Sequence, residues 1–292
     1  MASARDIRRR IRTVKNIQQI TGAMKMVAAA RLRRAQEAVE SARPYAEQMR
    51  YTMERLAESA GELQHPLLEH REGGRLGLLV FTSDRGLCGS YNVNVLRKAT
   101  EVLRGSPADS VRLYLVGTRG RDFLRRRGYP IAYSQSAPGG VVRFADVRRL
   151  TGMLRQDFER GEVDQVQLVF AQFVSAISQK PSVKQVLPLE APSQDGYHAG
   201  SVGPLHADYI YEPSPEELLG GLLPRYVDTQ IYQALLESVA SEHGARMTSM
   251  SNATSNAGEM IDTLTLDLNR ARQAGITKEL AEIIGGVEAQ KG

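Results

Sequence analysis

The sequence has 292 residues, enough for one large domain or two smaller ones, and 42% of them are hydrophobic, which permits a packed core. No apolar run of about 18 residues occurs, so no segment is expected to span a membrane. The single cysteine, Cys88, excludes an internal disulfide and a cysteine-based metal cluster. The net charge is only +5, but basic residues gather in the first 50 positions. That excess fits an acidic partner and a solvated helix face equally well.

Residues 1–60 are predicted to form one very long helix. Apart from Pro44 they contain no proline, and their apolar residues recur at steps of three and four, which is helical spacing. At about 1.5 Å per residue the helix would be roughly 80 Å long, far longer than a helix of a globular domain. The apolar stripe consists of Ile7, Ile11, Val14, Ile17, Ile20, Met24 and Val27.

Residues 75–205 are predicted to form a compact α/β domain, because strand and helix patterns alternate there. The expected strands are 76–82, 111–116, 130–133, 163–177 and 183–189, and the expected helices are 91–104, 118–127 and 144–160. The run 76–82 is apolar throughout, as is usual for a strand buried on both faces of a parallel sheet. Residues 191–204 are rich in Gly, Ser and Pro and indicate a loop.

Residues 213–290 are predicted to be helical again, with a kink or restart at Pro224. A seam with alternating steps of three and four runs through four heptads, which is typical of a left-handed coiled coil. The seam consists of Met247, Met250, Thr254, Ala257, Ile261, Leu264, Leu268, Ala271 and Gly275.

A long helix with one apolar stripe needs a partner, and the two terminal segments can supply it to each other by pairing antiparallel. The predicted fold is therefore a long antiparallel coiled coil of the N- and C-terminal helices with an inserted Rossmann-like α/β domain. The last segment is the longer one, so its end has no partner within the coil. The apolar residues of that end, which we expect to meet another protein, are Leu280, Ile283, Ile284 and Val287.

The stretch Ser83–Asn92 is the most enzyme-like motif, because it follows a strand and precedes a helix, where doubly wound folds bind phosphates. It matches neither of the common glycine-rich phosphate signatures, and a tight turn that needs glycine is the more ordinary interpretation. Cys88 within it reads as a half-buried small side chain rather than a nucleophile, since no base lies nearby in the sequence. A nucleotide-binding α/β enzyme with helical arms stays open as an alternative.

A DNA-binding coiled coil is a second alternative for the basic N-terminus. A basic-zipper protein places its basic region next to its heptads in one helix. Here the basic residues overlap the apolar stripe, and the long heptad run follows at the other end of the chain. That arrangement argues against nucleic acid as a partner.

Four blocks of the sequence resemble signatures of the F-type ATP synthase γ subunit, in its bacterial form without the chloroplast redox insert. Two small departures are Ser90 and Gly244, where the family more often has Gly and Ala. The blocks are Ile20–Leu32, Ser83–Asn92, Ser241–Met247 with its continuation to Thr254, and Asn269–Ile283.

The resemblance implies the central rotor shaft of a proton-translocating ATP synthase. Such a shaft couples proton flow through the membrane c-ring to ATP synthesis at the catalytic β subunits, and it regulates ATPase activity. It implies no catalytic residue, cofactor or metal on this chain. The implied partners are the hexamer of α and β subunits, the ε subunit and the ring of c subunits. The implied location is the cytoplasmic side of the cell membrane, peripheral and reached only through the complex.

The resemblance also assigns contact residues by their match to family motifs. The β-subunit contacts are Met24, Lys25, Arg272, Gln273, Thr277, Glu279 and Glu282. An apical bearing is assigned to Leu280, Ile283, Ile284 and Val287, and contacts with the c-ring and ε to Arg43, Tyr45, Tyr209, Tyr211 and Glu212.

Overall fold

The structure is a computed structural model of the chain, and it describes residues 4–59, 65–189 and 214–289. The chain divides into two compact units. One comprises residues 1–29 and 246–292, called the coil unit below, and the other comprises residues 30–245, called the body. Two long helices, α1 (Ala4–Ser59) and α5 (Pro215–Ala289), contribute residues to both units.

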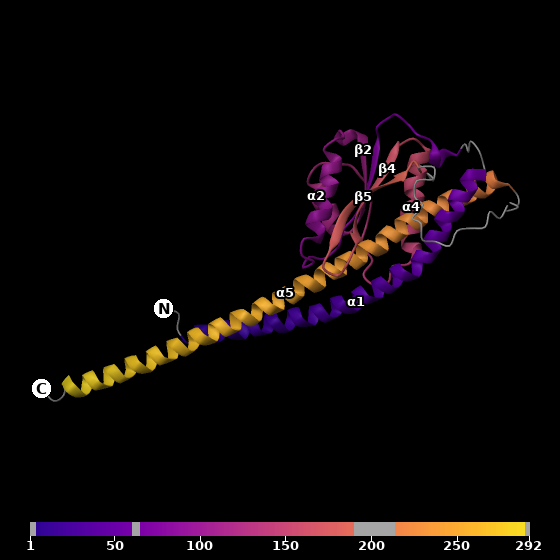
Figure 1. Cartoon of the computed structure of the whole chain (residues 1–292). Helices are drawn as coiled ribbons and strands as arrows, with labels where there is room; N and C mark the ends of the chain where they lie inside the picture. Colours follow the sequence, from indigo (N-terminus) through magenta and orange to yellow (C-terminus); the bar gives the residue numbers. More distant parts are fainter. Residues whose placement is uncertain (1–3, 60–64, 190–213, 290–292) are drawn as a thin grey trace. The chain divides into compact units, whose positions relative to one another are not determined.

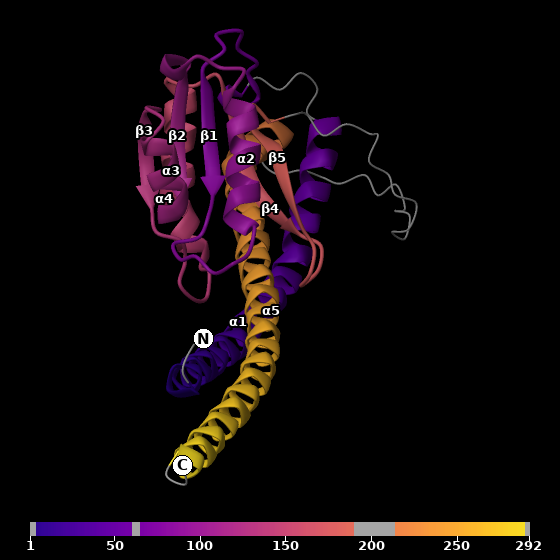
Figure 2. The same ribbon diagram turned by 90° about the vertical axis from the view of Figure 1, so that its left-hand side faces the viewer.

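The body is built on a five-stranded sheet of order β3-β2-β1-β4-β5 (Figures 1 and 2). Its strands are β1 (Leu76–Phe81), β2 (Val111–Val116), β3 (Ile131–Gln135), β4 (Gln165–Phe173) and β5 (Gln179–Leu187). The first four strands in this order are parallel, and β5 pairs antiparallel with β4. The predicted mainly parallel sheet is therefore confirmed.

Helices cover both faces of this sheet, with α2 (Tyr91–Leu103) and α4 (Phe144–Glu159) on opposite sides (Figures 1 and 2). The remaining elements of the body are α3 (Thr118–Arg125) and two short 3₁₀ turns, Pro66–Leu68 and Ala108–Ser110. Burial on both faces explains why β1 is apolar along its whole length.

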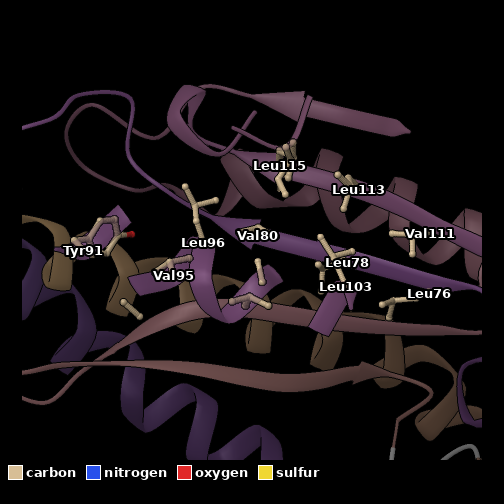
Figure 3. Packing of buried hydrophobic residues seen from close by; sticks show 14 of the residues in the cluster. Leu76, Leu78, Val80, Tyr91, Val95, Leu96, Leu103, Val111, Leu113 and Leu115 are labelled. Atoms are coloured by element: carbon tan, nitrogen blue, oxygen red, sulfur yellow. The ribbon is translucent and has the colours of Figure 1, made fainter. Parts of the chain in front are cut away.

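One core lies between the sheet and α2 (Figure 3). Alternate residues of a strand point to the same face, so Leu78 and Val80 of β1 point together toward α2. There they meet Val95 and Leu103, and all four side chains are fully buried or almost so. Burying one such side chain contributes roughly 1.5–3 kcal/mol, so this layer supplies much of the stability of the body.

The part of α5 that belongs to the body is joined to the sheet and to α2 by hydrogen bonds. The hydroxyls of Tyr91 and Ser238 share a buried bond of 2.8 Å, and Ser241 Oγ donates to the Ala171 carbonyl of β4 at 3.0 Å. A Cβ added to Gly244 would lie 3.1 Å from the Ala176 carbonyl oxygen. Glycine at this position thus lets the helix pass close to the backbone that follows β4.

Two predicted element boundaries are wrong, and so is one of the two alternatives predicted at Pro224, the restart of the helix. The predicted strand 163–177 is shorter, because Ser175–Ser178 form the β4–β5 turn, with the Ser175 N–H donating to the Ser178 carbonyl. β5 begins at Gln179 rather than 183 and includes Pro181, which an edge strand tolerates. α5 continues through Pro224 as a single helix, so no restart occurs there. The predicted loop 191–204 lies outside the described residues.

Candidate functional site

The coil unit consists of the N-terminal part of α1 packed against the C-terminal part of α5. Thr254 Oγ1 donates to Thr21 Oγ1 at 2.8 Å. A Cβ added to Gly258 would lie 3.2 Å from the side-chain nitrogen Nε2 of Gln18. From Thr254 to Gly258 the residue number on α5 rises by four, while on α1 the facing residue number falls from 21 to 18. The helices run antiparallel, as predicted, and the paired helices and the inserted sheet confirm the predicted fold.

The seam of α1 differs from the predicted stripe after Val14. Ile17, Ile20 and Val27 are 47%, 59% and 54% exposed, whereas Ala28 is 2% exposed. The alternation of four and three, continued from Val14, passes through Gln18, Thr21, Lys25 and Ala28, of which only Lys25 is exposed. Gln18 and Thr21 therefore occupy the seam positions predicted for Ile17 and Ile20. The predicted Met24 is half-buried whereas Lys25 is exposed, so the seam departs from the strict heptad at this point.

On α5 the predicted seam holds as far as Ala271. Met250 and Ala257 are buried, Ile261, Leu264, Leu268 and Ala271 are half-buried, and Gly275 is exposed. Because Thr21 lies opposite Thr254, residue 4 lies opposite about residue 271 in an antiparallel pair of equal rise. From Arg272 onward α5 therefore extends beyond the described part of α1.

This extension carries an apolar stripe. Leu280, Ile283 and Ile284 are 54%, 63% and 65% exposed and follow one another at steps of three and one, on one face of the helix. Ile276, one turn earlier, is also exposed. The side chains of Glu282 and Val287, the other predicted residues of this segment, lie outside the description of the structure.

The residues assigned to β-subunit contact lie in the coil unit on both helices. Met24 is half-buried and Lys25 is exposed on α1, while Arg272, Gln273, Thr277 and Glu279 are exposed on α5. The Thr277 hydroxyl donates to the Gln273 carbonyl one turn before it, at 3.0 Å. The exposed members can all reach a partner without a change in the coil.

The residues assigned to the c-ring and ε are only partly described. Arg43 and Tyr45 lie on α1 within the body, and both are exposed. Tyr209, Tyr211 and Glu212 lie outside the described residues.

The Ser83–Asn92 motif is a self-contained connection from β1 to α2. The Asp84 carboxylate accepts from the backbone N–H of Thr118, the first residue of α3, at 2.8 Å, and from that of Ala137 at 3.2 Å. The Asp84 carboxylate is thus the negative group that interacts with the positive N-terminal end of the α3 dipole. A phosphate at this edge of the sheet would compete with Asp84 for the same donors, which favours the structural interpretation of the motif.

The rest of the motif is held by Asn92. Its side-chain nitrogen donates to Ser83 Oγ at 2.8 Å and to Cys88 Sγ at 3.2 Å, and its oxygen accepts from the Ser83 N–H at 3.0 Å. Gly89 has φ 55°, in the left-handed region that glycine adopts without strain. Cys88 is 2% exposed, more deeply buried than the half-buried position predicted for it.

Comparison with known proteins decides the family. The sequence model of the family described as ATP synthase matches residues 3–290. The ATP synthase gamma chain of Heliobacterium modesticaldum is 51% identical over 293 residues, covering 99% of each chain, and that of Moorella thermoacetica is 47% identical over the full length of both. The chain belongs to the ATP synthase gamma chain family.

Solved structures of ATP synthases contain chains of the same fold. A chain from the central stalk and c-ring structure of the Tetrahymena thermophila mitochondrial ATP synthase is 25% identical, with a TM-score of 0.60, and covers 80% of this chain and 99% of that one. A chain of the Euglena gracilis mitochondrial ATP synthase has the same fold with a TM-score of 0.71, at 23% identity, covering 98% of this chain and 94% of that one.

As a gamma chain, the protein is the central-stalk rotor subunit of F-type ATP synthase and a non-catalytic subunit of that complex. The predicted family, function and non-enzymatic character are confirmed. Among the described helices, none is both long and apolar enough to cross a membrane.

Proposed function

We propose that the chain converts rotation of a proton-driven c-ring into conformational change at the catalytic β subunits of a surrounding α/β hexamer. The body is the end that meets the c-ring and the ε subunit, through Arg43 and Tyr45 among others. The coil unit is the end that turns inside the hexamer. The chain is held at the cytoplasmic side of the cell membrane through these partners.

The exposed apolar end of α5 is the observation that carries this proposal. Leu280, Ile283 and Ile284 are more than half exposed and lie on the part of α5 that extends beyond the described part of α1. Because each of these side chains is already partly covered, leaving the rest in water forgoes about half or more of the roughly 1.5–3 kcal/mol that full burial contributes. A hydrophobic sleeve around this end recovers that free energy without a specific directional bond, which is what a rotating bearing requires.

The surface of the coil unit supports the coupling role. Its faces differ, since Ile17, Ile20 and Val27 form an apolar strip on α1 outside the seam, while Arg272 and Gln273 present polar groups on α5. A shaft with unlike faces offers each β subunit a different surface at each rotary angle. Each angle then stabilises a different set of β conformations, as thermodynamic linkage requires.

The end of α5 can be tested by replacing Leu280, Ile283 and Ile284 together with Gln. Glutamine is a good helix former, so the fold should persist while the apolar surface is lost. We expect normal thermal unfolding of the isolated chain, but a clear fall in the yield of the assembled complex on co-expression with its partner subunits. Truncation after Ile276 should act in the same direction.

A matched control replaces the exposed polar residues Asp262 and Asn269 of the same helix with Gln. Assembly of this control should equal that of the parent. Full recovery of the complex with the triple variant would refute the bearing.

A further inference from the structure

The body contains a small pocket where α1, β5 and α5 meet. Its volume is about 180 Å³. The lining residues come from three separate elements, so a bound group would be met from three sides. They are Arg43, Ala46, Glu47 and Arg50 of α1, Lys184 of β5, and Tyr226, Thr229, Gln230 and Gln233 of α5.

The charge of this pocket is positive. The charged residues of the lining are three basic ones, Arg43, Arg50 and Lys184, and one acidic one, Glu47. Arg50 is engaged outside the pocket by Glu54, at 2.5 Å. In contrast, within the described parts of the chain neither Arg43 nor Lys184 has an ion pair or side-chain hydrogen bond.

A further carboxylate, Glu237, lies close enough to interact with these cations. Glu237 interacts electrostatically with Lys184 and Arg43, but burial raises its pKa, and its Oε2 is buried without a hydrogen-bond partner in the described structure. Desolvation by the surrounding protein lowers the pKa of Lys184, but the residue as a whole is exposed and keeps contact with water. Within the described residues no carboxylate lies at ion-pair distance from its ammonium group. An anion in the pocket would supply the missing interaction.

The volume of the pocket and its hydrogen-bond donors restrict the class of ligand that it can bind. A volume of about 180 Å³ is below the range of roughly 300–1,000 Å³ usual for drug-sized molecules, so the pocket can enclose one small group of a ligand rather than a whole nucleotide. The Tyr226 hydroxyl and the Gln233 amide also line the pocket and can donate as well, whereas the Thr229 hydroxyl already donates to the Arg225 carbonyl at 2.8 Å. Donors on three sides suit a tetrahedral anion, whereas a planar carboxylate is best met by one bidentate fork.

From this geometry we infer that the pocket binds a single phosphate group, either as free inorganic phosphate or as the head group of an anionic phospholipid. The gamma chain would thereby carry a ligand site of its own on the rotor. Arg43 is shared with the proposed c-ring contact, so Lys184 gives the cleaner test. The site does not depend on the proposed bearing, which lies in the other unit.

The test uses the full-length chain and calorimetric titration with inorganic phosphate at low ionic strength. We expect saturable binding at one site per chain, weakened by about tenfold or more in Lys184→Gln, because a charge-assisted hydrogen bond is lost. Arg43→Gln should weaken binding similarly. The matched control is Lys180→Gln, which removes the same charge from the same strand at a residue outside the pocket.

A second arm separates the two sources of phosphate. Vesicles of phosphatidylcholine, with and without phosphatidic acid, are sedimented with the parent and with each variant. Retention that requires phosphatidic acid and Lys184, without binding of free phosphate, assigns the site to a lipid head group. Equal binding by parent and Lys184→Gln in both arms, or an equal loss in Lys180→Gln, would overturn the inference. Thermal unfolding of each variant checks that a loss of binding is not caused by unfolding of the protein.

Discussion

The body and the coil unit bury their side chains in opposite ways. In the body, large residues such as Phe81, Tyr114 and Phe158 are less than 2% exposed. In the described part of the coil unit, the buried apolar residues are Ile7, Ala28, Met250 and Ala257, and two of these are alanines. The body therefore buries its large apolar side chains within itself, whereas the coil unit leaves much of its apolar surface exposed.

This contrast assigns different physical tasks to the two parts of a rotor. A well-packed body transmits force because its core resists deformation. A coil with a small-residue seam keeps its helices close together while its outer faces stay available. The same substitution should thus act through stability in the body and through assembly in the coil unit.

The largest loss of stability is expected from Gly117→Ala, in the connection between β2 and α3. Gly117 has φ 101°, and an added Cβ would lie 2.2 Å from the Thr82 carbonyl oxygen. Neither the backbone conformation nor the space admits a side chain, so the free energy of unfolding should fall by about 3 kcal/mol or more. Denaturant unfolding of the full chain measures this.

Gly139→Ala is the control for that substitution, since its added Cβ meets no atom within 4 Å. It should change the free energy of unfolding by less than about 0.5 kcal/mol. If Gly117→Ala and Gly139→Ala had the same free energy of unfolding, the close approach of Gly117 to Thr82 would be refuted.

A smaller effect is expected from Asp164→Asn, at the start of β4. The Asp164 carboxylate, 2% exposed, accepts from the backbone N–H of Arg75 and from its guanidinium, at 2.7–2.9 Å. The substitution removes hydrogen bonds to a charged acceptor and should cost about 2 kcal/mol at pH 7. Denaturant unfolding at a series of pH values measures both the loss and its pH dependence.

The sign of the pH dependence follows from the same contact. The hydrogen bond and charge of Arg75 lower the pKa of Asp164. Its stabilisation is therefore complete above the unfolded pKa of about 3.9 and is lost as pH falls through the lower folded pKa. The difference between parent and variant should shrink in that acid range. The exposed Asp109→Asn serves as control, and a difference independent of pH would contradict the ion pair.

The smallest effect is expected in the seam of the coil unit, at Thr21 and Thr254. Thr254→Val alone should cost about 1 kcal/mol, because Thr21 Oγ1, which itself donates to the Gln18 carbonyl, loses the hydroxyl that donates to it. The double variant with Thr21→Val should regain most of that loss, since two apolar groups of the same shape then face each other. Thermal unfolding followed by circular dichroism provides this double-mutant cycle, and strictly additive losses would show that the two hydroxyls do not interact.

Much of the fold was predictable because it depends on short-range periodicity. The strands at 76–81 and 111–116, the helices near 91 and 144, and the seam of α5 from Met250 to Ala271 follow from apolar runs and heptad steps. Turn details were less accessible, because the end of β4 depends on hydrogen bonds of Ser175 rather than on hydrophobicity.

The site residues were named by motif rather than by pattern, and their contacts with other subunits stay predictions. What physical reasoning contributed is the exposed end of α5, since a helix longer than its partner must leave apolar residues uncovered. The seam of α1 was misplaced because its polar members Gln18 and Thr21 resemble surface residues in the sequence. The signal that would have found them is the step of four followed by three from Val14, which leads through Gln18 to Thr21.

The sequence by itself determined the elements of this protein, the antiparallel pairing of its terminal helices and its family, because these are written in local spacing and in contiguous motifs. Only the tertiary structure decided which face of α1 enters the seam, how Asp84 closes the start of α3, and that Lys184 and Arg43 line one pocket. Each of these joins residues far apart in the chain. Packing brings such residues together through the combined geometry of several elements, and no local pattern records that geometry.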